Sequence, residues 1–138
     1  MTNISKKPLS VEATRNIGFQ FAEVVTHLQS KKKAKDFFED LLSDAEEMML
    51  HKRLAVIFML HRGFSFTTVR ECLKVSPSTV AKVARTLDRG GYAAIVCFLE
   101  QKKVRETLQE DIEKLLRGGL PRYGKGRWKK VHELIDKR

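Results

Sequence analysis

The 138-residue chain lacks the features that define several protein classes. It has 2 cysteines, Cys72 and Cys97, which are too few for a disulfide framework and are typical of a reducing compartment. Its longest uninterrupted apolar run, residues 92–99, is much shorter than the ~18 residues that a membrane span needs. The first ten residues, MTNISKKPLS, contain no apolar signal segment. We therefore expect a cytoplasmic protein that is neither secreted nor membrane-bound.

Patterns for catalysis and metal binding are also missing. The 4 histidines lie without metal-ligand spacing, and no Cys-x-x-Cys pair, phosphate-binding loop or nucleophile-and-base set occurs. We therefore expect no enzymatic activity, no cofactor and no metal ion.

Negative charge is scarce, because 17 acidic residues face 27 lysines and arginines, for a formal net charge of +10. The surplus is concentrated in two segments. Residues 64–90 carry 5 basic and 2 acidic side chains, and residues 118–138 carry 7 and 2. A cationic surplus in particular segments indicates a polyanionic partner, most often nucleic acid.

Prolines are few and apolar residues show no period of two, so the pattern predicts an all-α fold. Residues 92–99 fit a buried strand or a helix by periodicity, and helix is favoured because no partner strand is visible. The capping box Ser43–Glu46 predicts a helix that buries Met49, Leu50, Leu54, Ile57, Phe58 and Leu60 and ends at Gly63. We expect helices over residues 10–28, 37–42, 43–63, 65–74, 76–88, 92–99 and 104–116.

Residues 65–88 have the layout of a helix-turn-helix, with two short helices joined by about three residues and the second opened by Ser76-Pro77. If Phe66 is its first residue, the slots that must be apolar hold Val69, Leu73, Val75, Val80 and Val83. Two slots depart from the usual pattern, with Arg70 in place of a small residue and Lys74 in place of glycine. The predicted DNA-facing residues of the second helix are Ser76, Ser78, Thr79, Lys82 and Arg85, with Thr67, Thr68 and Arg70 near the flanking phosphates.

The segment LLSDAEEMMLHKRLAVIFMLHRGFSFTTVRECLKVSPSTVAKVARTLDRGGY resembles the bacterial Trp-repressor superfamily, particularly its YerC/YecD-type members. The LLS-x-x-E helix start, the HRG turn, STVAKVARTL and the closing RGGY carry the resemblance, which covers about residues 37–92. It implies a multi-helix, intertwined homodimer that presents two helix-turn-helix units to double-stranded DNA. On this basis we expect a sequence-specific transcriptional regulator, most simply a repressor.

The resemblance also raises the question of a corepressor. In the Trp repressor itself, tryptophan is held by arginines between the third helix and the recognition helix, beside a glycine. Ser43 and Arg53 correspond by position to members of that pocket, whereas Lys82 replaces an arginine and Val83 the glycine. The branched side chain of Val83 would occupy the space of the indole. We therefore expect no tryptophan corepressor, and a structural or phosphate-facing role for Arg53.

We divide the chain into an all-helical dimerisation and DNA-binding domain, residues 1–117, and a basic C-terminal arm with a short helix, residues 118–138. The apolar stripes over residues 11–28 and 92–116 exceed what a small domain needs to cover, which favours pairing with a second copy. The arm could follow a phosphate backbone or enter the minor groove, or it could be a solvated terminus whose Trp128 and Leu134 pack on the core. Its candidate phosphate-binding residues are Arg122, Lys125, Arg127, Lys129 and Lys130. Two alternatives stay open: a helical RNA or ribonucleoprotein-binding module, and a polymerase-interacting module similar to a sigma-factor region.

Overall fold

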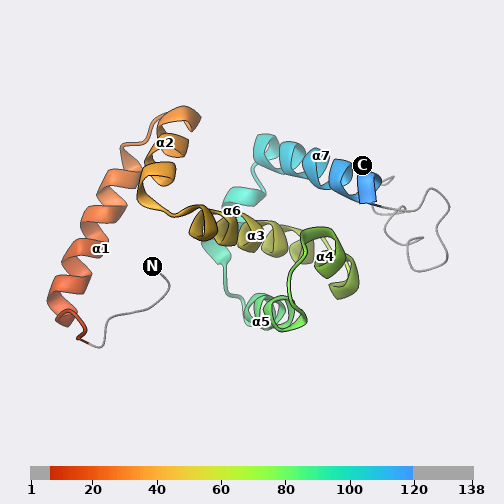
Figure 1. Ribbon diagram of the computed structural model, residues 1–138, viewed down its shortest axis with the longest axis horizontal. Helices are drawn as coiled ribbons and strands as arrows, with labels where there is room; N and C mark the ends of the chain where they lie inside the picture. Colours follow the sequence, from red (N-terminus) through yellow and green to blue (C-terminus); the bar gives the residue numbers. More distant parts are fainter. Residues whose placement is uncertain (1–6, 120–138) are drawn as a thin grey trace. The chain divides into compact units, whose positions relative to one another are not determined.

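The computed structural model describes residues 7–119, and in this part of the chain every regular element is a helix (Figure 1). None of these helices is long and apolar enough to cross a membrane. The all-α prediction is confirmed. The helices are α1 (Val11–Thr26), α2 (Lys31–Leu41), α3 (Asp44–His61), α4 (Phe66–Leu73), α5 (Pro77–Asp88), α6 (Ala93–Leu99) and α7 (Lys102–Gly119).

Serine hydroxyls precede five of these helices and accept hydrogen bonds from backbone N–H groups of the first turn. The Oγ atoms of Ser10, Ser30, Ser65 and Ser76 accept from Ala13, Lys33, Thr68 and Thr79 at 3.1–3.3 Å. At the start of α3 the predicted capping box is present in both directions. The Ser43 N–H donates to Glu46 Oε2 at 2.9 Å, and the Glu46 N–H donates to Ser43 Oγ at 3.3 Å.

The chain divides into two compact units, Met1–His51 and Lys52–Arg138, and the boundary lies inside α3. Helices α1 and α2 of the first unit bury no residue. Their aromatic side chains meet, with 6.1 Å between the ring centroids of Phe21 and Phe37. Helix α2 begins at Lys31, earlier than the predicted residue 37. The Ser30 hydroxyl is its N-cap and accepts the Lys33 N–H, so the lysine-rich segment forms the first turn of the helix.

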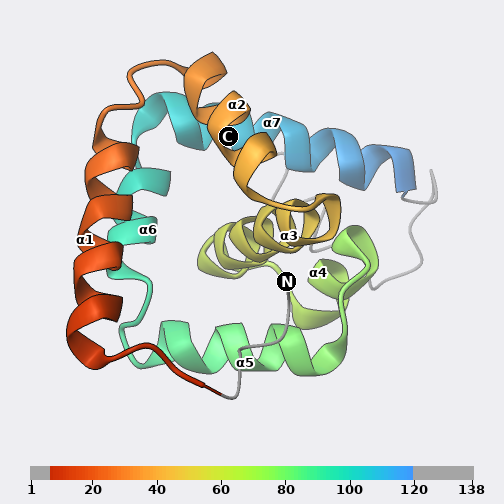
Figure 2. The same ribbon diagram turned by 60° about the vertical axis from the view of Figure 1, so that its left-hand side comes forward.

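The second unit is built around the last turns of α3. Four successive residues, Val56 to Met59, are 0–1% exposed, so this stretch of α3 is covered on every side. Figures 1 and 2 both place α7 on one side of α3 and α5 on the other. The core is completed by Phe64, Val69, Leu73, Val80, Val83, Leu99, Ile112 and Leu116.

The prediction of a helix over residues 92–99 and the prediction of the residues that α3 buries have different outcomes. Helix α6 confirms that residues 92–99 are helical, and its Leu99 is buried. The prediction that α3 buries Met49, Leu50 and Leu54 is wrong, since these side chains keep 52%, 42% and 40% of their surface exposed. The core of the second unit closes around α3 only from Val56 onward, which leaves the preceding apolar residues in solvent.

Polar contacts join the end of α3 to the turn between α6 and α7. His61 Nε2 lies 2.8 Å from Glu100 Oε1, and Arg105 Nη1 lies 3.6 Å from Glu100 Oε2. These groups are partly exposed, so the pairs contribute little to stability and mainly orient the two segments.

Candidate nucleic-acid interface

Helices α4 and α5 form the predicted helix-turn-helix, with a short, sharply bent turn. Lys74 ends α4 in the left-handed conformation, φ 54° and ψ 48°, and its N–H donates to the Arg70 carbonyl. Pro77 then occupies the first turn of α5, where its missing N–H costs nothing. The turn therefore has the geometry that glycine usually supplies, here adopted by a lysine.

The apolar side chains predicted to hold the two helices together do lie in the core. Val69 and Val80 are fully buried, Leu73 and Val83 are nearly so, and Val75 is partly buried against them. Because both helices contribute to one close-packed core, α5 is held at a fixed angle to α4.

The opposite side of α5 is exposed and polar. Ser78, Thr79, Lys82 and Arg85 are all exposed, while Val80 and Val83 between them face the core. At the start of the helix, Ser76 Oγ lies 2.8 Å from Thr79 Oγ1 and 3.1 Å from Ser78 Oγ. The structure thus brings these predicted residues to one face of one helix.

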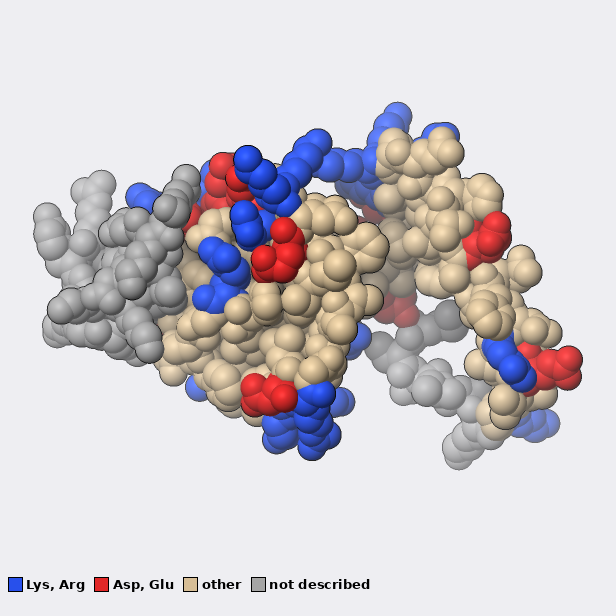
Figure 3. Space-filling view, turned by 180° about the vertical axis from the view of Figure 1, so that it is seen from behind, with Lys and Arg blue, Asp and Glu red and all other residues tan. Residues whose placement is uncertain are grey.

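Lys82 and Arg85 carry the charge of this face. Within the described part of the chain, neither side chain forms an ion pair with a carboxylate. Figure 3 shows basic side chains gathered over α5 at the lower edge of the second unit, with acidic ones beside them. Unpaired cations on an exposed helix face are free to contact phosphate or base edges.

The residues predicted on α4 do not all share this exposure. Thr67 and Arg70 are exposed, whereas Thr68 is 2% exposed and its hydroxyl lies 2.8 Å from Ser65 Oγ. The Thr68 hydroxyl is satisfied inside the cap of α4, and the burial of its side chain removes it from the candidate interface. The expectation that Thr68 lies near DNA is corrected accordingly.

The structure adds two cations that the sequence reasoning did not assign to the interface. Lys74 is exposed at the bend of the turn, and Lys52 Nζ of α3 donates to its carbonyl oxygen at 3.4 Å. The Lys52 ammonium group therefore lies at the turn that precedes α5, and Lys74 is an exposed residue of that turn. The signal in the sequence was Lys74 itself, in the slot where the motif usually has glycine.

Two further residues of this region, Arg53 and Cys72, differ in exposure. Arg53 is exposed on α3. Burial raises the pKa of the Cys72 thiol, so it stays protonated and is a poor nucleophile. The described residues contain no group of histidine, cysteine or carboxylate side chains that could hold a metal ion.

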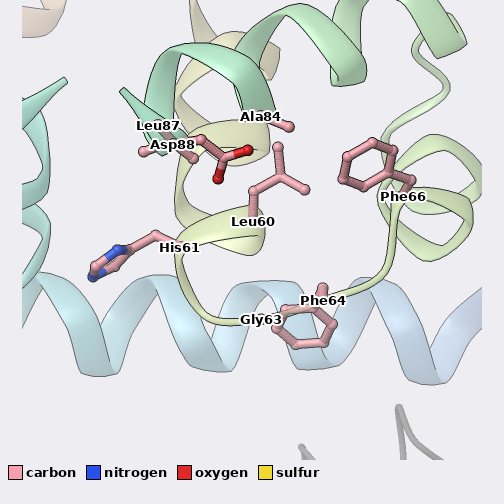
Figure 4. Close-up of a pocket in the computed structure, with 8 residues that line it drawn as sticks. All are labelled: Leu60, His61, Gly63, Phe64, Phe66, Ala84, Leu87 and Asp88. Carbon is pink, nitrogen blue, oxygen red and sulfur yellow. The ribbon is translucent and has the colours of Figure 1, made fainter. Parts of the chain in front are cut away.

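A hollow of about 350 Å³ lies where the end of α3, the start of α4 and the end of α5 approach one another (Figure 4). Leu60, Phe64, Phe66, Ala84 and Leu87 form most of its wall. The Asp88 carboxylate lies over Leu60, while the His61 ring points away. The hollow is open to solvent, and its wall exposes polar as well as apolar surface. Asp88 and His61 do not converge within it, so no set of polar groups defines a ligand.

The predicted phosphate-binding arm, with Arg122, Lys125, Arg127, Lys129 and Lys130, lies outside the described residues.

Comparison with known families agrees with this geometry. The family model described as Trp repressor protein matches residues 19–103, which is more than half of the chain and includes α4 and α5. No curated protein and no solved structure matches the sequence.

Proposed function

Because the chain belongs to the Trp repressor protein family, whose members are helix-turn-helix DNA-binding regulators, we propose that it is a sequence-specific transcriptional repressor that places α5 in the major groove. One observation carries the proposal. Helix α5 buries Val80 and Val83 on one side and exposes Ser78, Lys82 and Arg85 on the other. A rigid helix with short hydroxyls and unpaired cations on its free face suits a groove lined by base edges and phosphates.

Each exposed side chain has a defined role in this proposal. The hydroxyls of Ser76, Ser78 and Thr79 contact the backbone and base edges where α5 enters the groove. Lys82 and Arg85 contact guanine or phosphate, and a guanidinium binds guanine through two parallel hydrogen bonds. Thr67 and Arg70 flank the groove at the phosphates.

The experiment is a selection of bound sequences from a random duplex library, followed by titration of the selected duplex. We expect Lys82→Ala and Arg85→Ala each to weaken binding by about 1–3 kcal/mol, with relaxed specificity where a guanine contact is lost. Lys114→Ala, which removes an exposed cation of α7, is the matched control and should change affinity little. Equal affinities for both α5 variants and the wild-type chain would refute the groove assignment.

We also propose that the protein acts as a homodimer. Its support is the number of large apolar side chains that stay exposed in the single chain, including Ile17, Phe19, Met48, Met49 and Phe98. Surfaces of this kind are commonly covered by a second copy. Light scattering at low micromolar concentration should give a mass near twice 15.9 kDa. A monomer would instead favour the RNA-binding or polymerase-interacting alternatives.

We further propose that tryptophan is not a corepressor of this protein. Val83 is 5% exposed and belongs to the core, so its branched side chain fills space beside α5. Calorimetric titration should show no heat of binding at micromolar tryptophan, and saturable binding would overturn the proposal.

The basic arm is proposed to follow the phosphate backbone beside the groove. Deleting residues 118–138 should then lower the salt dependence of DNA binding, because fewer counterions are released. An unchanged slope would remove the arm from the interface.

A further inference from the structure

A second cationic surface lies outside the helix-turn-helix, at the start of α2. Lys31, Lys32 and Lys33 form its first turn, and all three side chains are exposed; we name them the α2 lysine patch. Figure 3 shows basic side chains gathered where α2 begins. None of the three side chains forms an ion pair within the described residues.

The charge of α2 runs opposite to what an isolated helix prefers. The first turn of a helix carries the positive end of the macrodipole and favours acidic side chains, yet here it holds lysines and no acidic residue. The last turn favours cations, but α2 ends with Glu39 and Asp40 and has no basic residue there. The lysines therefore destabilise the free helix, and a bound polyanion would relieve that repulsion.

Asp36 is the acidic residue nearest the patch, four residues after Lys32 and three after Lys33, and it forms no ion pair with either lysine within the described residues. Lys35 Nζ lies 3.3 Å from Glu39 Oε1, so this pair is satisfied within the helix. Glu39 lies seven residues beyond Lys32, or about 10 Å along the helix axis, which is close to the screening length at 0.1 M salt. Asp36 lowers the positive potential at the start of α2, but three lysines beside one carboxylate leave that potential positive.

The opposite side of α2 is already engaged. Phe37 and Phe38 are partly buried, with their ring centroids 5.2 Å apart, and Phe37 also meets Phe21 of α1. A helix that lies in a lipid surface inserts its apolar side chains. The two aromatic rings of α2 are held within the first unit, and its exposed apolar side chain, Leu41, lies at the end of the helix away from the lysines. The three lysines form an exposed cationic cluster at the start of α2, and such a cluster suits the phosphates of a nucleic acid.

We propose that the α2 lysine patch binds the phosphate backbone of duplex DNA independently of sequence, as a second contact surface in addition to α5. This inference rests on the proposed DNA-binding function. The patch raises affinity for any duplex through counterion release, whereas α5 discriminates between sequences.

The test uses the full-length triple variant Lys31→Gln, Lys32→Gln, Lys33→Gln and a labelled mixed-sequence duplex of about 40 base pairs. Fluorescence anisotropy between 50 and 200 mM salt should show the slope of log affinity against log salt reduced by about 2–3, at about 0.9 per lost phosphate contact. The control is Lys102→Gln, Lys103→Gln, Lys114→Gln, which lowers the net charge equally on α7 and should leave the slope nearly unchanged.

A stability measurement excludes a merely structural role for the lysines. The lysines oppose the helix dipole of α2, and the triple variant removes their charge. The triple variant should therefore unfold at the same or a higher temperature than the wild-type chain. An unchanged slope would overturn the proposal, and so would an equal reduction in the control. Loss of binding to phosphatidylglycerol vesicles together with an unchanged duplex slope would also overturn it and indicate a membrane partner.

A different result would show that the proposed sequence-specific binding by α5 is wrong. If the wild-type protein selects no preferred sequence but binds the mixed duplex in a patch-dependent way, α5 does not read sequence and the patch proposal stands.

Discussion

Helices α1 and α2 bury no residue at all, whereas four successive residues of α3, from Val56 to Met59, are almost completely buried. The first unit exposes large apolar side chains such as Phe19, while the second closes a core that includes α4 and α5. The second unit can therefore hold the helix-turn-helix rigid by its own packing. The exposed apolar side chains of the first unit are the basis on which we proposed a homodimer.

The largest expected effect separates the two units directly. Phe58→Ala removes a side chain with no exposed surface and should lower the free energy of unfolding by about 3–5 kcal/mol. Phe19→Ala, at a position that is 67% exposed, should change the free energy of unfolding of the monomer by less than about 0.5 kcal/mol. Urea denaturation at concentrations where the protein is monomeric measures both. Similar losses would mean that α1 has a core of its own.

Alanine substitutions of two glycines, one in each unit, compare the packing of the units with smaller expected changes in stability. A Cβ atom at Gly91 would lie 2.5 Å from Thr86 Cγ2 and 2.8 Å from the Thr86 carbonyl oxygen, so Gly91→Ala should cost about 1–3 kcal/mol. A Cβ atom at Gly18 of α1 meets nothing within 4 Å, and Gly18→Ala should stabilise the helix by about 0.5–1 kcal/mol.

Thermal unfolding followed by circular dichroism gives the sign of both glycine substitutions. A loss of stability in Gly18→Ala would show that α1 is closely covered in solution, and the contrast between the units would then hold only for the single chain.

The sequence was most informative where local chemistry decides the structure. Ser43 with Glu46, and Ser76 with Pro77, predicted helix starts that the hydrogen bonds reproduce. Periodicity alone did not separate buried from exposed apolar residues, because Leu54 and Phe58 have the same helical spacing but only Phe58 is enclosed. The sequence also could not predict the burial of Thr68. A threonine hydroxyl can bond to water on the surface or to a neighbouring serine, and here it lies beside Ser65 Oγ.

The turn of the helix-turn-helix allows a prediction of intermediate size. Lys74 holds a left-handed conformation that disfavours a side chain, so Lys74→Gly should raise the stability of the second unit by up to about 1 kcal/mol. Lys74→Ala removes the same charge without relieving the backbone and is the matched control. If Lys74 also contacts phosphate, both variants should weaken DNA binding alike. Equal stabilities of the two variants would contradict the backbone argument.

The smallest effect concerns the capping box at the start of α3. The hydrogen bond from the Ser43 N–H lowers the pKa of Glu46 below its ordinary value of 4.5. The contribution of this carboxylate to stability is therefore complete above pH 4.5 and is lost as the pH falls through the lower pKa of the folded state. The stability difference between the wild-type chain and Glu46→Gln should shrink as the pH is lowered from 6 to 3. A constant difference for Glu46→Gln would show that its carboxylate is not held by the cap.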